Sequence, residues 1–424
     1  MATTIAWGRM RALRSRNYRL FFAGQSVSLI GTWMTRLATS WIVYQLTDSA
    51  FLLGLTSFAG QIPAFFVAPI AGVWLDRWNR HHVLVITQVL AMIQSLALAA
   101  LAFTGSINLW WVIGLTLCQG LINAFDMPAR QAFVIEMIEE RADLGNAIAL
   151  NSSMVNGAKL VGPAIAGVLI AGAGAGFCFL IDGLSYIAVI WSLLAMKVAP
   201  VAPYVVQKSA LQELGEGWKY VVESQAIRSI LLLLALVSVV GMPYTVLMPV
   251  VAVDILHGGA HTLGFLVGMS GVGALASAIG LALRKTVIGL GKRIAITAGV
   301  FGSGLVFLGI SKSLTISLLL MTVTGFGMMQ QMAASNTILQ TIAADDKRGR
   351  VMSFYTLAIL GMNPIGSLLA GAVAARIGVP ATMIGAGAIC LAGALWFYWK
   401  LPEIRAVIRP IYRELGILPE VAEG

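Results

Sequence analysis

Long apolar segments alternate with short polar connections along the whole chain. Twelve such segments can be delimited, and most reach the roughly 20 residues that an α-helix needs to cross the hydrocarbon core of a bilayer. They lie at about 19–45, 50–75, 82–104, 107–128, 147–171, 176–196, 229–254, 262–283, 293–311, 314–337, 351–375 and 380–399. The pattern predicts an all-α membrane protein with 12 transmembrane helices.

The longest polar connection divides these helices into two sets of six. Within it, residues 209–223 have the alternation of an amphipathic helix that lies on a membrane surface. We expect five parts: a cytoplasmic N-terminus, a six-helix bundle, a cytoplasmic linker, a second six-helix bundle and a cytoplasmic tail, at 1–18, 19–197, 198–228, 229–400 and 401–424.

The two sets of helices resemble each other. Gly54-Leu55-Thr56 in the second segment has a counterpart about 210 residues later in Gly264-Phe265-Leu266. Gly162-Pro163 in the fifth segment likewise corresponds to Asn363-Pro364 in the eleventh. Such a parallel repeat predicts two halves related by a pseudo-two-fold axis, with a substrate site near the midplane where the halves meet.

Composition supports the membrane assignment. Hydrophobic residues make up 58% of the chain and charged residues 11%, against about 25% charged in an ordinary soluble protein. The mean hydropathy is +0.87. The apolar surface is therefore too extensive for a soluble core, and lipid is an expected partner of the chain.

The net charge of +10 reflects topology. With both ends placed on one side of the membrane, 24 of the 28 lysines and arginines fall on that side. The positive-inside rule then predicts that both termini are cytoplasmic. This distribution accounts for the basic charge without a nucleic-acid partner.

The turn after the second segment carries a recognisable motif. It reads GVWLDRWNRHHVL from Gly72 to Leu84 and resembles the signature loop of the major facilitator superfamily, in which Gly, Asp-Arg, Gly and a basic pair recur at fixed spacing. Asn79 stands where glycine is usual and is a residue that tolerates a left-handed turn. His81 stands where a second basic residue is usual.

The resemblance implies a cytoplasmic gate. In similar proteins an acid at the end of the fourth segment joins the loop in a charge relay, and that place is held here by Asp126, which lies four residues before Arg130. The implied gate residues are Gly72, Asp76, Arg77, Arg80, Asp126 and Arg130. An ordinary basic turn, or a local cap around Pro128, is the simpler alternative.

The fifth segment narrows the family further. Gly157, Gly162, Pro163 and Gly167 resemble, with incomplete spacing, a glycine-proline motif found mainly in exporters of the superfamily. Small residues that only pack helices would look the same. The phrases at 17–26, 125–131 and 348–353 resemble the branch that contains the enterobactin exporter and related transmembrane secretion effectors.

Charged side chains inside the apolar segments mark candidate functional positions, because each costs about 3 kcal/mol to insert. Arg36 and Lys159 can attract an anionic or catecholate-like substrate, and Asp182 can carry a proton because burial favours a neutral carboxyl group. A structural ion pair or a local hydrogen bond is the alternative for each. Uncharged candidates for lining a pathway are Gln25, Gln119, Asn123, Gln331 and Asn336.

These features together predict a secondary active transporter and not an enzyme. The expected activity is proton-coupled export of a small organic molecule, such as a siderophore, drug or other secondary metabolite, by alternating access of a monomer. No phosphate-binding loop is present, and the four histidines and three cysteines suggest neither a metal site nor a cofactor. A lipid or lysophospholipid flippase, an importer of the same fold and a non-transporting membrane sensor remain as alternatives.

Overall fold

A computed structural model describes residues 10–75, 78–198, 218–284 and 286–417. Within these ranges the secondary structure is helical, with no strand. Asp76 and Arg77, most of the linker that contains the expected amphipathic helix, and both chain ends lie outside the described residues. Residues 218–223, the end of that expected helix, are helical.

The first six long helices correspond to the first six apolar segments. They are α2 (Arg16–Thr47), α3 (Ala50–Leu75), α4 (Arg80–Phe103), α5 (Leu109–Met137), α6 (Leu144–Ala173) and α7 (Ala175–Leu194). A short 3-10 helix, η1 (Arg11–Arg14), precedes α2, and another, η2 (Arg141–Asp143), precedes α6.

The later segments form less regular helices, some of which are interrupted by π-helical or 3-10 turns. They are α9 (Gln225–Leu236), η3 (Val237–Gly241), η4 (Met242–Leu247), α10 (Met248–Val250), η5 (Val251–Ile255), α11 (Ala260–Ala282), α12 (Leu290–Ile310), α13 (Leu314–Ile342), α14 (Arg348–Thr356), η6 (Leu357–Gly361), α15 (Met362–Ile377) and α16 (Val379–Glu414). In the described ranges, 11 helices are long and apolar enough to cross a membrane. The remaining apolar segment lies in α2, whose 32 residues are long enough but carry Arg16, Arg19 and Arg36.

Two of the spans contain π-helical turns beside proline. The stretch from Gln225 to Ile255 passes through η3 and η5 on either side of Pro243 and Pro249. The stretch from Arg348 to Ile377 passes through η6 just before Pro364. Proline lacks an N–H and collides with the carbonyl four residues earlier, so the hydrogen-bond ladder shifts register locally.

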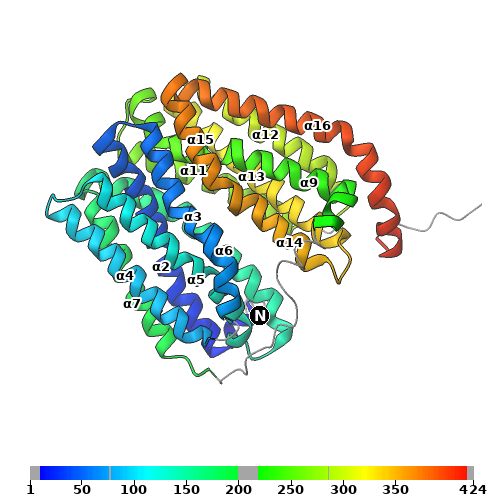
Figure 1. Cartoon of the computed structure of the whole chain (residues 1–424), viewed down its shortest axis with the longest axis horizontal. Coiled ribbons are helices and arrows are strands. Elements are labelled where there is room, and N and C mark those ends of the chain that lie inside the picture. Colours follow the sequence, from blue (N-terminus) through cyan, green and yellow to red (C-terminus); the bar gives the residue numbers. More distant parts are fainter. Residues whose placement is uncertain (1–9, 76–77, 199–217, 285, 418–424) are drawn as a thin grey trace, which may run out of the picture. The chain divides into compact units, whose positions relative to one another are not determined.

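The chain forms two compact units. Unit 1 comprises residues 1–206 and 246–271, and unit 2 comprises residues 207–245 and 272–424. In unit 1, α2 packs against α6 and α7, α3 against α5, and α4 lies beside α7 (Figure 1). In unit 2, α12 packs against both α13 and α16.

A pair of glycines allows the close contact of α12 with α16. A Cβ atom on Gly302 of α12 would lie 2.8 Å from the carbonyl oxygen of Gly387 in α16, and one on Gly387 would lie 2.5 Å from the Gly302 oxygen. Both distances are too short for any side chain. Without an expulsion of apolar surface from water, helices in lipid associate through such close backbone packing.

Candidate functional site

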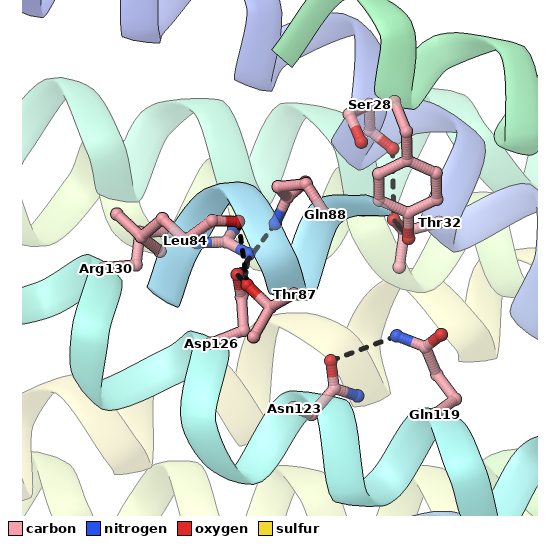
Figure 2. Close-up of polar contacts among 10 residues, drawn as sticks. Ser28, Thr32, Leu84, Thr87, Gln88, Gln119, Asn123, Asp126 and Arg130 are labelled. Atoms are coloured by element: carbon pink, nitrogen blue, oxygen red, sulfur yellow. Dashed lines mark hydrogen bonds and ion pairs between the residues drawn. The ribbon is translucent and has the colours of Figure 1, made fainter. Parts of the chain in front are cut away.

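A polar cluster lies between α4 and α5 in unit 1, centred on Asp126. The Asp126 side chain is 2% exposed, and its Oδ1 atom accepts a hydrogen bond of 2.7 Å from Gln88 Nε2. The Thr87 hydroxyl lies 3.1 Å from the same oxygen, and Arg130 forms an ion pair with Oδ2. Figure 2 shows Thr87, Gln88 and Arg130 converging on this carboxylate.

The Asp126–Arg130 pair depends on an unbroken α5. The helix continues through Pro128 to Met137, so residues four apart share one face. The pair is therefore a contact of one helix face, and α4 supplies the additional donors.

Arg80 has a partner that sequence reasoning missed. Its Nη1 atom lies 2.9 Å from Oε1 of Glu136, in the last turn of α5. The pair joins the start of α4 to the end of α5, ten residues beyond Asp126. Glu136 is the nearest acid after Asp126 in the sequence, which is the signal that could have identified it.

Asn79 does not adopt the left-handed conformation that its place in the motif suggested. Its φ is −69°, and it is the N-cap of α4, with Oδ1 accepting a 3.2 Å hydrogen bond from the His82 backbone N–H. An asparagine at an N-cap satisfies one of the free donors of the first turn. Asn79 therefore acts as a helix cap and not as a left-handed turn residue.

His81 also has a defined contact. Its Nε2 atom lies 2.8 Å from the carbonyl oxygen of Leu193, in the last turn of α7, and its ring lies 5.8 Å from that of Phe133. The residue thus links α4, α5 and α7 at one end of unit 1. Gly72, another residue of the signature loop, lies in the last turn of α3.

A second polar cluster surrounds Asp182 of α7, which is 2% exposed. The Ser95 hydroxyl of α4 lies 3.0 Å from Asp182 Oδ2 and 2.9 Å from the carbonyl oxygen of Phe179. A hydroxyl has one hydrogen, so it can donate to only one of these acceptors at a time. Gly31 of α2 packs directly on the Asp182 backbone, where a Cβ atom would lie 2.8 Å from its Cα.

The two cations of the apolar segments meet at one aromatic ring. Arg36 Cζ lies 4.8 Å from the centroid of the Trp33 ring, and Lys159 Nζ of α6 lies 5.8 Å from it. Arg36 also interacts electrostatically with Asp182. The structure thus brings together three residues that the sequence could mark only one by one.

Two glycines of the exporter-type motif on α6 lie in close helix contacts, and the third does not. A Cβ atom on Gly162 would lie 2.6 Å from Cβ of Trp33, and one on Gly167 would lie 2.8 Å from Cα of Gly264 in α11. A Cβ atom on Gly157, by contrast, would meet nothing within 4 Å. The helix runs through Pro163 without interruption.

The uncharged candidates separate into local pairs and buried side chains. Gln119 Nε2 donates to Asn123 Oδ1 at 3.2 Å along α5, as Figure 2 shows. Asn336 pairs with Gln340 along α13 in unit 2. Gln25 and Gln331 are buried, and among the described residues the Gln331 amide has no hydrogen-bond partner.

Comparison with known proteins identifies the family. The model for the family described as transmembrane secretion effector matches residues 8–413. The staphyloferrin A transporter of Staphylococcus aureus is 24% identical, covering 89% of this chain and 95% of that protein. The multidrug efflux pump Tap of Mycolicibacterium fortuitum is 25% identical, with 91% and 94% covered, and macrolide efflux protein A of Streptococcus pyogenes is 24% identical, with 89% and 95% covered.

Solved structures give the same fold. A POT family transporter bound to 5-aminolevulinic acid aligns with a TM-score of 0.73 at 12% identity, covering 92% of this chain and 97% of that one. The nucleoside transporter NupG aligns with a TM-score of 0.69 at 12% identity, covering 90% and 98%. The chain therefore belongs to the transmembrane secretion effector family, whose members are major facilitator membrane transporters and not enzymes.

Proposed function

We propose that this protein is a proton-coupled exporter that moves a small organic molecule, a siderophore, drug or other secondary metabolite, out of a bacterial cell by alternating access. It works as a monomer in the cytoplasmic membrane and uses no cofactor. Both termini are cytoplasmic, and the two six-helix halves comprise residues 19–197 and 229–400. Relatives named as a siderophore transporter and as drug efflux pumps support this substrate range.

The observation that carries proton coupling is the contact of Asp182 with Ser95. An ionised Asp182 can accept the single Ser95 hydrogen, which the Phe179 carbonyl can also accept. A protonated Asp182 donates its own hydrogen to Ser95, and the Ser95 hydrogen then remains with Phe179. Both protonation states therefore have hydrogen-bonded arrangements, as a group that gains and loses a proton in each cycle requires.

The cluster around Asp126 supports the gating role. Gly72, Asp76, Arg77 and Arg80 supply the loop side of the proposed cytoplasmic gate, and Asp126 and Arg130 supply the helix side. Glu136 joins this set through Arg80. Charged groups that exchange partners between two arrangements are a common basis for switching in transporters and other two-state proteins.

Contacts of the fifth span support the direction of transport. Gly162 lets α2 approach α6, and Gly167 lets α11 approach the same helix. Gly157, Pro163 and these two glycines resemble, with incomplete spacing, an exporter-type motif. At 162 and 167 any side chain would collide with a neighbouring helix.

Transport by inside-out vesicles tests the proposal. Vesicles that contain the protein should accumulate a radiolabelled siderophore when their interior is acidified, because uptake into inside-out vesicles corresponds to export from cells. A protonophore should abolish accumulation. Accumulation that is indifferent to the pH gradient would contradict proton coupling, and accumulation only in right-side-out vesicles would contradict export.

A further inference from the structure

Trp33 of α2 has a cation from each of two helices next to its ring. Arg36 lies one turn further along α2, with Cζ 4.8 Å from the ring centroid, and Lys159 reaches the ring from α6, with Nζ at 5.8 Å. Both distances are within the range of a cation–π interaction. The two positive groups are therefore no farther apart than the sum of these distances, although 123 residues separate them in sequence.

Gly162 makes this arrangement possible. A Cβ atom at position 162 would lie 2.6 Å from Trp33 Cβ and 2.9 Å from the carbonyl oxygen of Ile30, so any larger residue would push α2 away from α6. The glycine therefore acts as a positioning residue for the ring and, through the ring, for both cations. Gly162, whose motif could serve helix packing alone, thus also determines how close Arg36 and Lys159 lie to the same ring.

Within the described part of the chain, neither cation is in direct contact with an acid. Among the described residues, no Asp or Glu oxygen lies within 4.0 Å of Arg36 or Lys159. Asp182 acts on Arg36 electrostatically from α7, but its hydrogen-bond partner is Ser95. The group of Arg36, Lys159 and Asp182 thus retains an excess positive charge even when Asp182 is ionised.

Each of the three side chains also keeps surface that the rest of the protein does not cover. Arg36 is exposed, and Trp33 and Lys159 are half-buried, although all three lie well inside their helices. A purely structural cation within a membrane span is expected to be buried against a carboxylate or a row of carbonyl groups. Two neighbouring cations that repel each other and lack such partners form a preorganised site for an anion.

We infer that Arg36, Trp33 and Lys159 form an anion-recognition site and that the exported compound is an organic anion with one or more carboxylate groups. This inference rests on the proposed transport function. The planar guanidinium group of Arg36 can donate two parallel hydrogen bonds to one carboxylate. The Lys159 ammonium group provides a point charge for a second acidic group or a hydroxyl. Trp33 holds both cations in place before the anion arrives, which lowers the ordering cost of binding.

The charge of such a substrate agrees with export. The interior of a bacterial cell is electrically negative, so an anion that moves outward moves down the membrane potential. Uptake of the same anion would have to work against it. Selection for negative charge and outward transport are therefore compatible in one protein.

Equilibrium binding to the purified full-length protein in phosphatidylcholine nanodiscs tests the inference. The probes are two matched pairs, citrate with trimethyl citrate and salicylate with salicylamide, in which the second member lacks the carboxylate charge. The anionic members should bind more tightly than their neutral partners. Added salt should weaken the binding of the anionic members. Arg36→Gln and Lys159→Gln should each reduce anion affinity about tenfold, and Lys312→Gln, which removes an exposed cation between α12 and α13, should not change it.

Equal binding of the neutral and anionic members, or equal effects of Arg36→Gln and Lys312→Gln, would overturn the inference. If Arg36→Gln does not fold, Lys159→Arg and Lys159→Gln are compared instead. Anion affinity should be retained in Lys159→Arg, which keeps the charge, and reduced in Lys159→Gln, which removes it. Failure of this site and failure of the proposed function are distinguishable. Proton-driven efflux of neutral or cationic compounds without anion binding would refute only the site, and anion binding without gradient-driven transport would refute only the function.

Discussion

Arg80 at the start of α4 forms an ion pair with Glu136 in the last turn of α5, with 2.9 Å between Nη1 and Oε1. The side chains are 25% and 13% exposed, so the pair is shielded from most of the solvent. It closes one end of the α4–α5 pair, and the Asp126 cluster lies deeper between the same two helices. These two interactions are the part of the proposed gate that can be tested most directly.

We expect Glu136→Gln to reduce transport and to lower thermal stability by about 2 kcal/mol, the typical loss for a hydrogen bond to a charged group. Thermal unfolding of the purified protein and vesicle transport are the two measurements. The control is Glu223→Gln, which breaks an exposed pair with Lys219 whose side chains are 64% and 78% exposed. Exposed pairs of this kind contribute little. Equal effects of the two changes would show that burial of the Arg80 pair is unimportant.

Asp126→Asn should destabilise the protein more strongly. It leaves Arg130 without its carboxylate and keeps Thr87 and Gln88 facing a neutral amide. Removal of one partner of a buried pair costs roughly 3–5 kcal/mol, and the lower figure applies here because the Arg130 side chain is 22% exposed. The measurement is again thermal unfolding. Arg130→Gln in the Asp126→Asn background should recover part of the loss, and no recovery would argue against the pair.

Asp182→Asn should uncouple transport from protons. Asparagine has the size of aspartate but cannot carry a proton, so exchange of substrate across the membrane should persist while accumulation driven by a pH gradient is lost. The control is Asp345→Asn, which removes an exposed acid paired with Arg348 between α13 and α14. Gradient-driven accumulation that survives Asp182→Asn would remove this residue from the coupling mechanism.

Two glycines on α6 provide a matched comparison. Gly162→Ala should destabilise the α2–α6 contact by about 1–3 kcal/mol, because its Cβ atom would lie 2.6 Å from Trp33 Cβ. Gly157→Ala should be neutral or stabilise the helix by up to about 1 kcal/mol, because its Cβ atom meets nothing within 4 Å. Thermal midpoints of both variants check this, and the reverse order would contradict the packing described.

Several features of the fold were predictable from the chain alone because they depend on local sequence. Each of the apolar segments lies within or largely overlaps a helix, and α5 and α6 run through Pro128 and Pro163 as an apolar span requires. The irregular path of residues 225–255 was not predicted, although Pro243 and Pro249 were its visible signal. A proline indicates where the helical hydrogen-bond pattern is interrupted. Whether the interruption becomes a kink, a 3-10 turn or a π-turn depends on the packing of the surrounding helices.

The candidate sites were predictable only in part. Arg36, Lys159 and Asp182 stood out because a charge in an apolar segment is costly wherever it points. Asp126 was identified through the resemblance to the major facilitator superfamily. Their partners did not stand out. Trp33 was one aromatic residue among many, Ser95 one hydroxyl, and Glu136 lay beyond the end of an apolar segment, where an acid needs no special explanation.

By itself, then, the sequence determined the membrane environment, the helices and the costly charges, since hydropathy, helix length and insertion energy are properties of single segments. Only the tertiary structure decided which side chains meet: Arg80 with Glu136, Asp182 with Ser95, and both Arg36 and Lys159 with the Trp33 ring. The physical reason is that such pairings depend on how closely two helices approach and how each is rotated about its axis. Contacts between distant residues, such as that of Gly162 with Trp33, set both of these quantities.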